Sequence, residues 1–411
     1  MKKIIILLIS LVFLFSCNEE EKTAIAVNNE FCVNKRDIEK VVNDFTAKTT
    51  RGGSLQIVSV DSLSNQEQTT REIGSTNSPQ NLLYFVKLSD NSTVIVAGDK
   101  RAEPVYAHIN NLELKFSNGR LLNQNEVPES FKYMLGVSAA SIMNSVNSNS
   151  EVNPNWTANT TRATGDADYI LPSKCKVEWG QGSPFNLQSP FIITPVSMEP
   201  LGDHGRFYAG CVTIATAQAL TVFYEDFRIF KGYRLKTSWK VLKNRKKYSA
   251  FYNQDEIEDI SNIVKRIAEN IKIEYNSKNG GAGTDTKNAI KFLDRYLGGA
   301  YGHDSDWGKV ESNMRDNPCG ISFLSGNPQS HGWLWKKLGI DMPSLTGHCM
   351  LLDGYKKVNG RTLFYINFGW DGSYNGYYLY DDKTWNEGAP KEYRLNMSVY
   401  NFHLDTDFDD F

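Results

Sequence analysis

The sequence has few cysteines for its length and almost no excess of either charge. Its 411 residues include 6 Cys, 45 Lys and Arg, and 47 Asp and Glu, for a formal net charge of −2. No CxxC pair is present, which argues against a zinc or redox motif, and so few cysteines in so long a chain do not form a disulfide framework. In an oxidising compartment Cys175 and Cys319 could still pair. The charge balance gives no argument for nucleic acid, and we expect no nucleic-acid partner, cofactor or metal.

Long hydrophobic runs are also lacking, except at the N-terminus. Residues 4–15 are apolar and follow Met1-Lys2-Lys3, a pattern typical of an export signal and too short to span a bilayer. The run ends in Leu14-Phe15-Ser16-Cys17, which resembles a bacterial lipoprotein box. That resemblance implies a signal peptide over 1–17 and a lipid on Cys17 that anchors the chain to a membrane. The alternative is an ordinary secretory signal cut nearby.

The residues after Cys17 bear on the protein's location. Asn18 is followed by three glutamates, so an acidic tether comes next, and the Asp associated with inner-membrane retention is missing. We therefore expect a location in the bacterial cell envelope, as an outer-membrane lipoprotein or at the cell surface, or an extracellular one after processing.

Residues 25–143 have the pattern of a small α+β domain. Apolar residues at helical spacing predict helices over 37–48 and 128–143. Strands are predicted over 55–60, 82–88, 93–97, 106–109 and 112–116, with a turn at Asp90-Asn91. His108 is the only histidine in this part, and a structural role is expected for it.

Residues 144–168 differ from both neighbours in composition. They are dominated by Asn, Ser and Thr, with few apolar side chains, which predicts a flexible linker exposed to proteolysis. The second domain is predicted over 169–404, where aromatic and glycine content rises. Its helices are expected from Cys211 to Phe227, over 255–271 and over 286–297.

A cysteine at the start of a helix is the first chemical signal. Gly210 precedes Cys211, and a run of small and apolar residues follows. The unpaired N–H groups and the dipole at a helix N-terminus favour a thiolate, the reactive form of cysteine. A small core residue at a helix start is the competing interpretation of Cys211.

A histidine and an asparagine complete the pattern. His348 lies 137 residues after Cys211, and Asn367 lies 19 residues after His348 (348 − 211 and 367 − 348). This order and spacing are those of papain-like cysteine proteases. The imidazole would take the thiol proton and return it to the leaving amine, while an amide orients the ring. Trp370 would shield the His–Asn hydrogen bond from water.

The turn between these two residues tests the assignment. A tight turn at Asn359-Gly360 would place Asn367 opposite Leu352 and Asp371 opposite His348. For His348 and Asn367 to be neighbours, a wide loop over about 355–361 or a bulge is required. A strict two-residue register would instead make Asp371 the candidate orienter.

These motifs resemble the streptopain family of bacterial cysteine proteases. The likeness rests on residues 180–186, 210–218 and 280–283, on Gly347-His348 and on residues 367–372, with a weaker likeness over 82–109. It implies an α+β papain-like fold, a helical part plus an antiparallel sheet or barrel, preceded by a small inhibitory α+β prodomain. It also implies a zymogen activated by a cut in the linker, with proteins or peptides as substrates.

The resemblance assigns roles residue by residue. Cys211 is the implied nucleophile, His348 the general base and acid, Gln181 the oxyanion donor and Asn367 the orienter. Phe368 stands where the family usually has Trp, and Cys349 is unusual beside His348; we expect the Cys349 side chain to point away from Cys211. The alternatives are a catalytically inactive protease-fold binding or inhibitor protein at the cell surface, and an enzyme acting on small amides with the same residues.

Overall fold

The structure, a computed structural model, describes the chain in stretches separated by gaps. These stretches are residues 30–49, 55–66, 80–157, 168–192, 202–223, 233–276, 280–297, 306–326, 332–341, 347–385 and 397–404. The predicted signal peptide with Cys17, and residues 158–167 of the predicted linker, lie outside the described residues. From Phe31 onward the chain forms one compact unit. Within the described stretches no helix combines the length and apolarity needed to cross a membrane.

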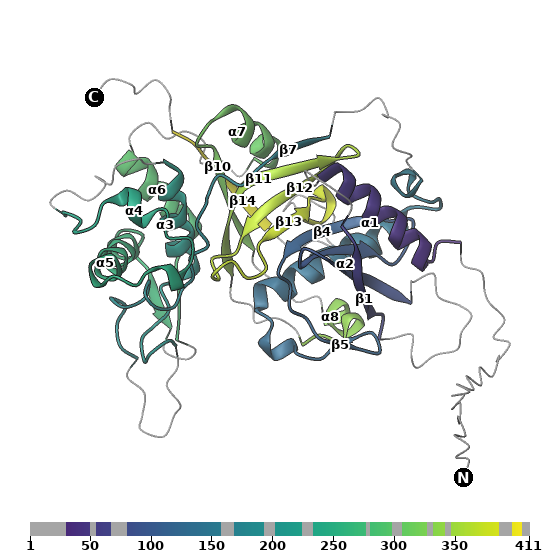
Figure 1. The fold of residues 1–411 in the computed structure, drawn as a ribbon, viewed down its shortest axis with the longest axis horizontal. Coiled ribbons are helices and arrows are strands. Elements are labelled where there is room, and N and C mark those ends of the chain that lie inside the picture. Colours follow the sequence, from purple (N-terminus) through teal and green to yellow (C-terminus); the bar gives the residue numbers. More distant parts are fainter. Residues whose placement is uncertain are drawn as a thin grey trace, which may run out of the picture. The chain divides into compact units, whose positions relative to one another are not determined.

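An antiparallel sheet of ten strands runs through both predicted domains (Figure 1). Its order is β1 (Ile57–Ser64), β2 (Asn81–Leu88), β3 (Ser92–Ala97), β4 (Val105–Asn110), β13 (Gly376–Leu379), β12 (Arg361–Asn367), β11 (His348–Val358), β10 (Ile321–Gly326) and β14 (Met397–Phe402), with β7 (Tyr169–Leu171) paired to β11. The N-terminal and C-terminal strands meet where β4 pairs with β13. The N-terminal part therefore extends the sheet of the C-terminal part.

The helices follow the predicted apolar spacing closely. The longer ones are α1 (Lys35–Thr49), α2 (Glu129–Ser148), α3 (Cys211–Phe223), α5 (Gln254–Asn270) and α6 (Thr286–Leu297). The shorter ones are α4 (Trp239–Leu242), α7 (Val310–Asp316), α8 (Gly332–Leu338) and α9 (Asp382–Trp385). Helix α1 shows why apolar spacing predicts helices: Ile38, Val42 and Phe45 lie on one face of the helix, and all three are buried.

Short ladders and turns fill the connections. Strand β5 (Phe116–Ser117) pairs with β6 (Arg120–Leu121), and β8 (Glu274–Asn276) pairs with β9 (Gly281–Gly283). Single 3-10 turns lie at η2 (Gln124–Glu126), η3 (Pro154–Trp156), η4 (Tyr248–Ala250) and η5 (Trp307–Lys309). The strand predicted over 112–116 was wrong for 112–115, because only its last residue joins a ladder.

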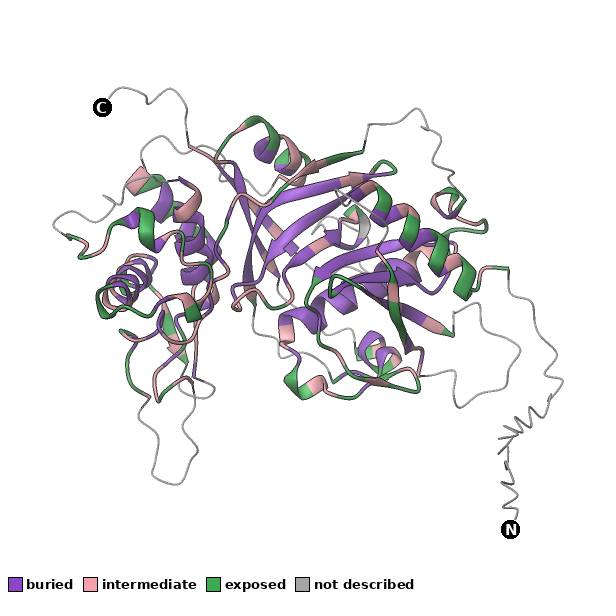
Figure 2. Ribbon diagram, in the orientation of Figure 1, coloured by how far each residue is buried: buried purple, intermediate pink, exposed green. Residues whose placement is uncertain are grey.

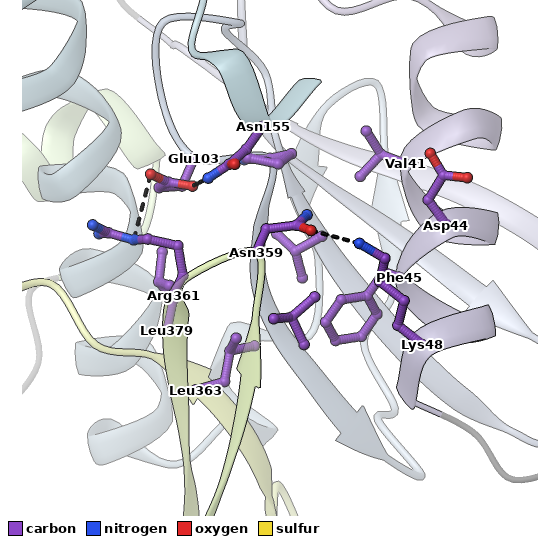
Figure 3. A pocket seen from close by; sticks show the side chains of 13 residues that line it. Val41, Asp44, Phe45, Lys48, Glu103, Asn155, Asn359, Arg361, Leu363 and Leu379 are labelled. Carbon is purple, nitrogen blue, oxygen red and sulfur yellow. Dashed lines mark hydrogen bonds and ion pairs between the residues drawn. The ribbon is translucent and has the colours of Figure 1, made fainter. Parts of the chain in front are cut away.

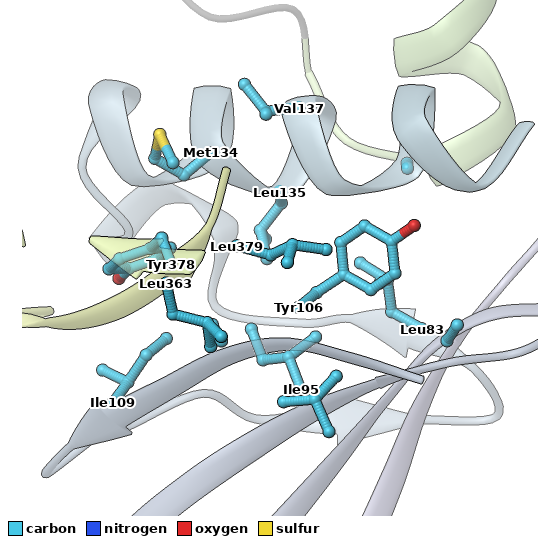
Figure 4. Packing of buried hydrophobic residues seen from close by; sticks show 14 of the residues in the cluster. Leu83, Ile95, Tyr106, Ile109, Met134, Leu135, Val137, Leu363, Tyr378 and Leu379 are labelled. Carbon is cyan, nitrogen blue, oxygen red and sulfur yellow. The ribbon is translucent and has the colours of Figure 1, made fainter. Parts of the chain in front are cut away.

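Two apolar clusters account for most buried side chains (Figure 2). The first joins α1, α2 and β1–β4 to residues of β11–β13, and the second packs α3, α5 and α6 against Phe323, Leu351 and Phe402. In Figure 4, Leu363 and Tyr378 of the C-terminal part lie among Ile95 and Tyr106 of the N-terminal part, next to α2. The N-terminal part thus shares a core with the C-terminal part, which favours a tightly docked arrangement.

The predicted linker begins later than the composition indicated. Helix α2 continues to Ser148, and Val146 and Trp156 are buried. The Trp156 indole N–H donates to the carbonyl of Ala102 at 2.9 Å, and the backbone N–H of Asn153 donates to the carbonyl of Lys100 at 2.7 Å. A linker starting at Asn144 was therefore wrong for 144–157, because a few apolar anchors hold this polar stretch against the N-terminal part.

Candidate active site

Helix α3 begins at Cys211, as the sequence predicted. The preceding Gly210 has φ +87°, and a Cβ there would lie 2.9 Å from the carbonyl oxygen of Ala282. Only glycine fits both constraints without strain. The Gly210 carbonyl accepts the first helical hydrogen bond, from Ile214 at 3.1 Å. This glycine therefore places the Cys211 thiol at the start of a helix whose next nine residues are buried.

The Cys211 thiol is held in its neutral form in this conformation. Burial raises the pKa of Cys211, and the backbone N–H groups of Cys349, Val212 and Cys211 itself oppose that shift. Desolvation of the thiol therefore outweighs the lowering of its pKa that the helix N-terminus predicts.

Gln181 lies beside the chain that leads into Cys211. Its backbone carbonyl accepts the Ala209 N–H at 2.9 Å, which ties the two segments together. Gln181 is half-buried, and its side-chain amide makes no hydrogen bond to another described residue. An amide that is positioned beside the nucleophile and not engaged elsewhere suits an oxyanion donor.

The hairpin between His348 and Asn367 combines a tight turn with a bulge. Val358 pairs with Arg361 around Asn359-Gly360, and both turn residues have positive φ. A register shift between Leu352 and Gly354 moves Asn367 opposite Leu351. The alternative of a wide loop was wrong. A bulge is present, but it shifts Asn367 by only one residue and does not place it opposite His348. Asp371 lies instead beside Gly180, where a Cβ would approach its carboxylate to 2.2 Å.

His348 opens β11, and its ring is bound by the chain just beyond Asn367. Its Nε2–H donates to the carbonyl oxygen of Phe368 at 2.9 Å, and its ring packs on Trp370 with centroids 4.7 Å apart. Burial lowers the pKa of His348 to about 4, with the Phe368 hydrogen bond opposing. The structure therefore brings His348 to Trp370, while the carbonyl of Phe368 accepts its Nε2–H. The shielding of a His–Asn hydrogen bond by Trp370 stays a prediction.

Asn367 is buried, and both N–H groups of its side-chain amide are engaged by its surroundings. Its Nδ2 donates to the Val177 carbonyl at 3.0 Å and to Gln218 Oε1 at 2.9 Å, while Oδ1 accepts the Gly369 N–H at 3.1 Å. None of these contacts is to His348. The orienting role of Asn367 stays a prediction that requires a different His348 conformation.

The other cysteines correct one prediction and leave one open. Cys349 and the partly buried Cys211 pack in the same apolar cluster, where burial raises the pKa of Cys349 and the nearby Cys211 adds to that shift. The prediction that Cys349 points away from Cys211 was therefore wrong. Adjacent strand residues alternate in direction, and here His348 takes the opposite face. Cys175 and Cys319 are both free thiols.

Two polar residues of this region were missed by sequence reasoning. Asn375 Oδ1 accepts the Phe368 N–H at 3.0 Å and so fixes the peptide next to the His348 acceptor. Gln218 contacts Asn367 from α3. It lies seven residues after Cys211, two helical turns further along the same face, and this spacing was a usable signal. Across the described stretches, His, Cys, Asp and Glu do not gather into groups of three suited to a metal.

Comparisons with known proteins find similar peptidases. Residues 179–378 match the Peptidase C10 family. Streptopain of Streptococcus pyogenes is 21% identical over 329 residues, covering 73% of this chain and 74% of streptopain. A solved fragment of prointerpain A from Prevotella intermedia, 18% identical, covers 80% of this chain and 96% of the fragment with a TM-score of 0.51.

The fold and the sequence matches together indicate the class of this protein. The mixed helix and antiparallel-sheet architecture is that of cysteine proteases that carry a prodomain, so the predicted fold class is confirmed. Within that class the chain is streptopain-like, and the match of residues 179–378 to the Peptidase C10 family supports a cysteine-type peptidase.

Proposed function

We propose that this protein is a cysteine endopeptidase made as a zymogen, which hydrolyses peptide bonds through Cys211 and His348. The observation that carries the proposal is the placement of Cys211 at the start of α3, with Gln181 tied beside it and His348 on a neighbouring strand of the same unit. This placement supplies a nucleophile, an oxyanion donor and a base within one region. His348 must turn from Phe368 toward Cys211 before the pair can ionise.

The N-terminal part supports the zymogen proposal through α2. Phe131 of α2 stacks on Tyr374 with centroids 4.5 Å apart, in the loop that also holds Trp370. Tyr133 covers Gly326, which pairs with His348, because a Cβ on Gly326 would lie 2.9 Å from its ring. Helix α2 thus packs on the elements that hold His348 in its present orientation, and its release would free them to move.

Contacts near the end of the N-terminal part and the start of the C-terminal part limit where the activating cut can lie. A small cavity between α1 and the β11–β12 turn is rimmed by polar contacts, with Lys48 donating to Asn359 and Arg361 paired to Glu103 at 3.4 Å (Figure 3). Glu103 also accepts from Asn155 at 2.9 Å. Because residues up to Trp156 are anchored to the N-terminal part and β7 is paired to β11, we expect the cut between residues 157 and 169.

Self-processing in a purified sample tests the proposal. The chain, lacking residues 1–17, is incubated under reducing conditions while its intact mass is followed. We expect loss of the segment up to the bracketed cut, followed by cleavage of an unfolded protein. A chain that stays inert even after an added protease has cut the linker would support the inactive binding or inhibitor protein instead. Activity on a small amide without casein hydrolysis would favour the small-substrate enzyme.

Replacing Gln181 with alanine tests the oxyanion role. We expect kcat of the processed enzyme to fall on the order of 10²- to 10³-fold, because the tetrahedral oxyanion loses its side-chain donor. KM should change little, since the donor acts mainly in the transition state. Steady-state kinetics on a peptide substrate measure both. An unchanged kcat would remove Gln181 from the mechanism.

Replacing Gly136 with alanine tests the inhibitory contact of α2. A Cβ at this position would lie 2.3 Å from the Trp335 ring of α8, so the two helices must separate. Such overpacking costs about 1–3 kcal/mol. We expect faster self-processing than in the unaltered chain, measured by the same mass assay. Ser145→Ala, further along α2 at a half-buried position, is the control for a rise in helix propensity alone. Equal processing rates in all three chains would contradict inhibition through α2.

The lipid anchor is a separate part of the proposal. The lipoprotein box ending at Cys17 supports export, lipid attachment and retention at the outer membrane or cell surface. Cys17→Ser should release the protein from the membrane fraction and abolish labelling by a radioactive fatty acid. Retention of both label and membrane association in Cys17→Ser would contradict lipidation at this residue.

A further inference from the structure

A fully buried glutamine connects three parts of the site. Gln218 lies on α3 and has no exposed surface. Its Oε1 accepts the backbone N–H of Trp179 at 3.1 Å and the Nδ2–H of Asn367 at 2.9 Å. Its Nε2 is buried and has no hydrogen-bond partner among the described residues. One side-chain oxygen thus joins the nucleophile helix to the segment before Gln181 and to the amide of Asn367.

These contacts fix which way both amides face. The Trp179 N–H can only donate, so the oxygen of Gln218 must face it. Asn367 must then present Nδ2 to Gln218, and its second N–H goes to the Val177 carbonyl at 3.0 Å. Asn367 Oδ1 is left as an acceptor that takes one N–H, from Gly369 at 3.1 Å, and keeps a second lone pair.

We propose that Gln218 is a positioning residue for the peptidase reaction, holding Asn367 with Oδ1 set to accept the Nε2–H of His348. The inference rests on the proposed function and goes beyond it. In the described conformation the His348 Nε2–H donates to Phe368, the residue next to Asn367. When His348 turns toward Cys211, Oδ1 of Asn367 is the oriented acceptor for that proton. Gln218 also ties this acceptor to the segment that carries the oxyanion donor.

The test compares two substitutions of Gln218 in the processed enzyme. Gln218→Met keeps the length of the side chain and removes both acceptor contacts. We expect kcat to fall about 10-fold or more, as on loss of other outer partners of a catalytic group. KM should stay within about twofold, and the alkaline limb of the kcat/KM profile should move about one unit down in pH, because the imidazolium loses an oriented acceptor. Gln218→Glu retains an acceptor oxygen and should leave this limb at or above its original pH.

Two further measurements separate positioning from folding. Thr213→Val removes a buried hydroxyl of α3 that has no partner among the described residues, so its pH profile should match the unaltered enzyme. The pH dependence of Cys211 alkylation by iodoacetamide reports the thiolate–imidazolium pair without any substrate and counts folded sites. If Gln218→Met does not fold, Gln218→Asn, one methylene too short to reach both partners, replaces it.

The outcomes are distinct. A downward shift of the alkaline limb in Gln218→Met, absent in Gln218→Glu and Thr213→Val, supports the inference. The inference is overturned if the alkaline limb of Gln218→Met stays where it is in the unaltered enzyme and its activity falls only as much as the number of folded active sites. Gln218 would then be a structural residue. Failure of the unaltered processed enzyme to cleave peptides would instead overturn the proposed function.

Discussion

Replacing Cys211 with alanine is expected to abolish peptide hydrolysis and self-processing while leaving the fold intact. The thiol is the only group at the start of α3 able to form a covalent acyl intermediate, and loss of the nucleophile in other proteases lowers kcat on the order of 10⁶-fold. Cys211 is only partly buried and its side chain is small, so alanine leaves little empty space. Kinetics on a peptide substrate and the intact mass of the unprocessed chain measure the two losses.

The matched control for this substitution is Cys319→Ala. Cys319 is a partly buried free thiol that contacts the Val222 carbonyl at 3.6 Å, near the end of α3. Its loss should lower stability without removing activity. A Cys211→Ala chain that still processes itself in pure form would remove Cys211 from the nucleophile's role, whatever the behaviour of the control.

Acidification is expected to loosen the N-terminal part from the C-terminal part through a buried hydrogen-bonded chain. Lys356 of β11 donates to His108 Nδ1 of β4 at 3.1 Å, and His108 Nε2 donates to Ser92 Oγ at 3.0 Å. Ser92 Oγ in turn donates to Asp90 at 2.6 Å. A neutral His108 therefore relays a hydrogen bond from a buried ammonium to a carboxylate, and a protonated His108 would face Lys356 with two donors.

The direction of the pH effect follows from the pKa of His108. Burial, and then the Lys356 charge, lower it from 6.5 to about 3. The unfolded chain takes up this proton below pH 6.5 and the folded chain only near pH 3, so this contribution to stability is complete above pH 6.5 and is lost as the pH falls toward 3. Its full size is on the order of 5 kcal/mol, of which about 3 kcal/mol is lost by pH 4.

The other groups facing this chain do not change that conclusion. Burial lowers the pKa of Lys356 to about 8, so Lys356 is charged throughout the acidic range and its own contribution is constant there. The negative charge of Asp90 acts on both His108 and Lys356. The rings of Phe45 and Tyr377, which also contact this pair, carry no charge. His108 is therefore the group of this chain that titrates between pH 6.5 and 4.

Urea unfolding at several pH values measures this effect. The Cys211→Ala chain serves as the background, because it should not process itself. His108→Gln replaces the ring by an amide able to accept from Lys356 and donate to Ser92 without taking up a proton. We expect it to lose less stability than the background between pH 6.5 and 4. Subtracting the free energies of unfolding of the two chains at each pH removes the contributions of the other titrating groups, such as His348 and Asp353, which both chains share. Parallel curves, or an equal change in the exposed control His204→Gln, would contradict the role of His108.

The longer helices and the candidate reactive groups could be predicted from the amino-acid sequence alone. Apolar spacing placed α1, α5 and α6 within one or two residues, because each helix buries one face. Gly210-Cys211 marked the start of α3, because only glycine tolerates the backbone conformation that delivers the thiol. The order of Cys211, His348 and Asn367 indicated the chemistry before any geometry was known.

How these groups are oriented depends on contacts between distant parts of the chain. The bulge in β11 sets the register of Asn367, and the direction of His348 depends on packing against Trp370 and on the Phe368 carbonyl. Local sequence carries no record of such contacts, since they join residues from distant parts of the chain. The pairing of β4 with β13 is likewise long-range, and it converts two predicted domains into one sheet that packs α2 over the elements holding His348.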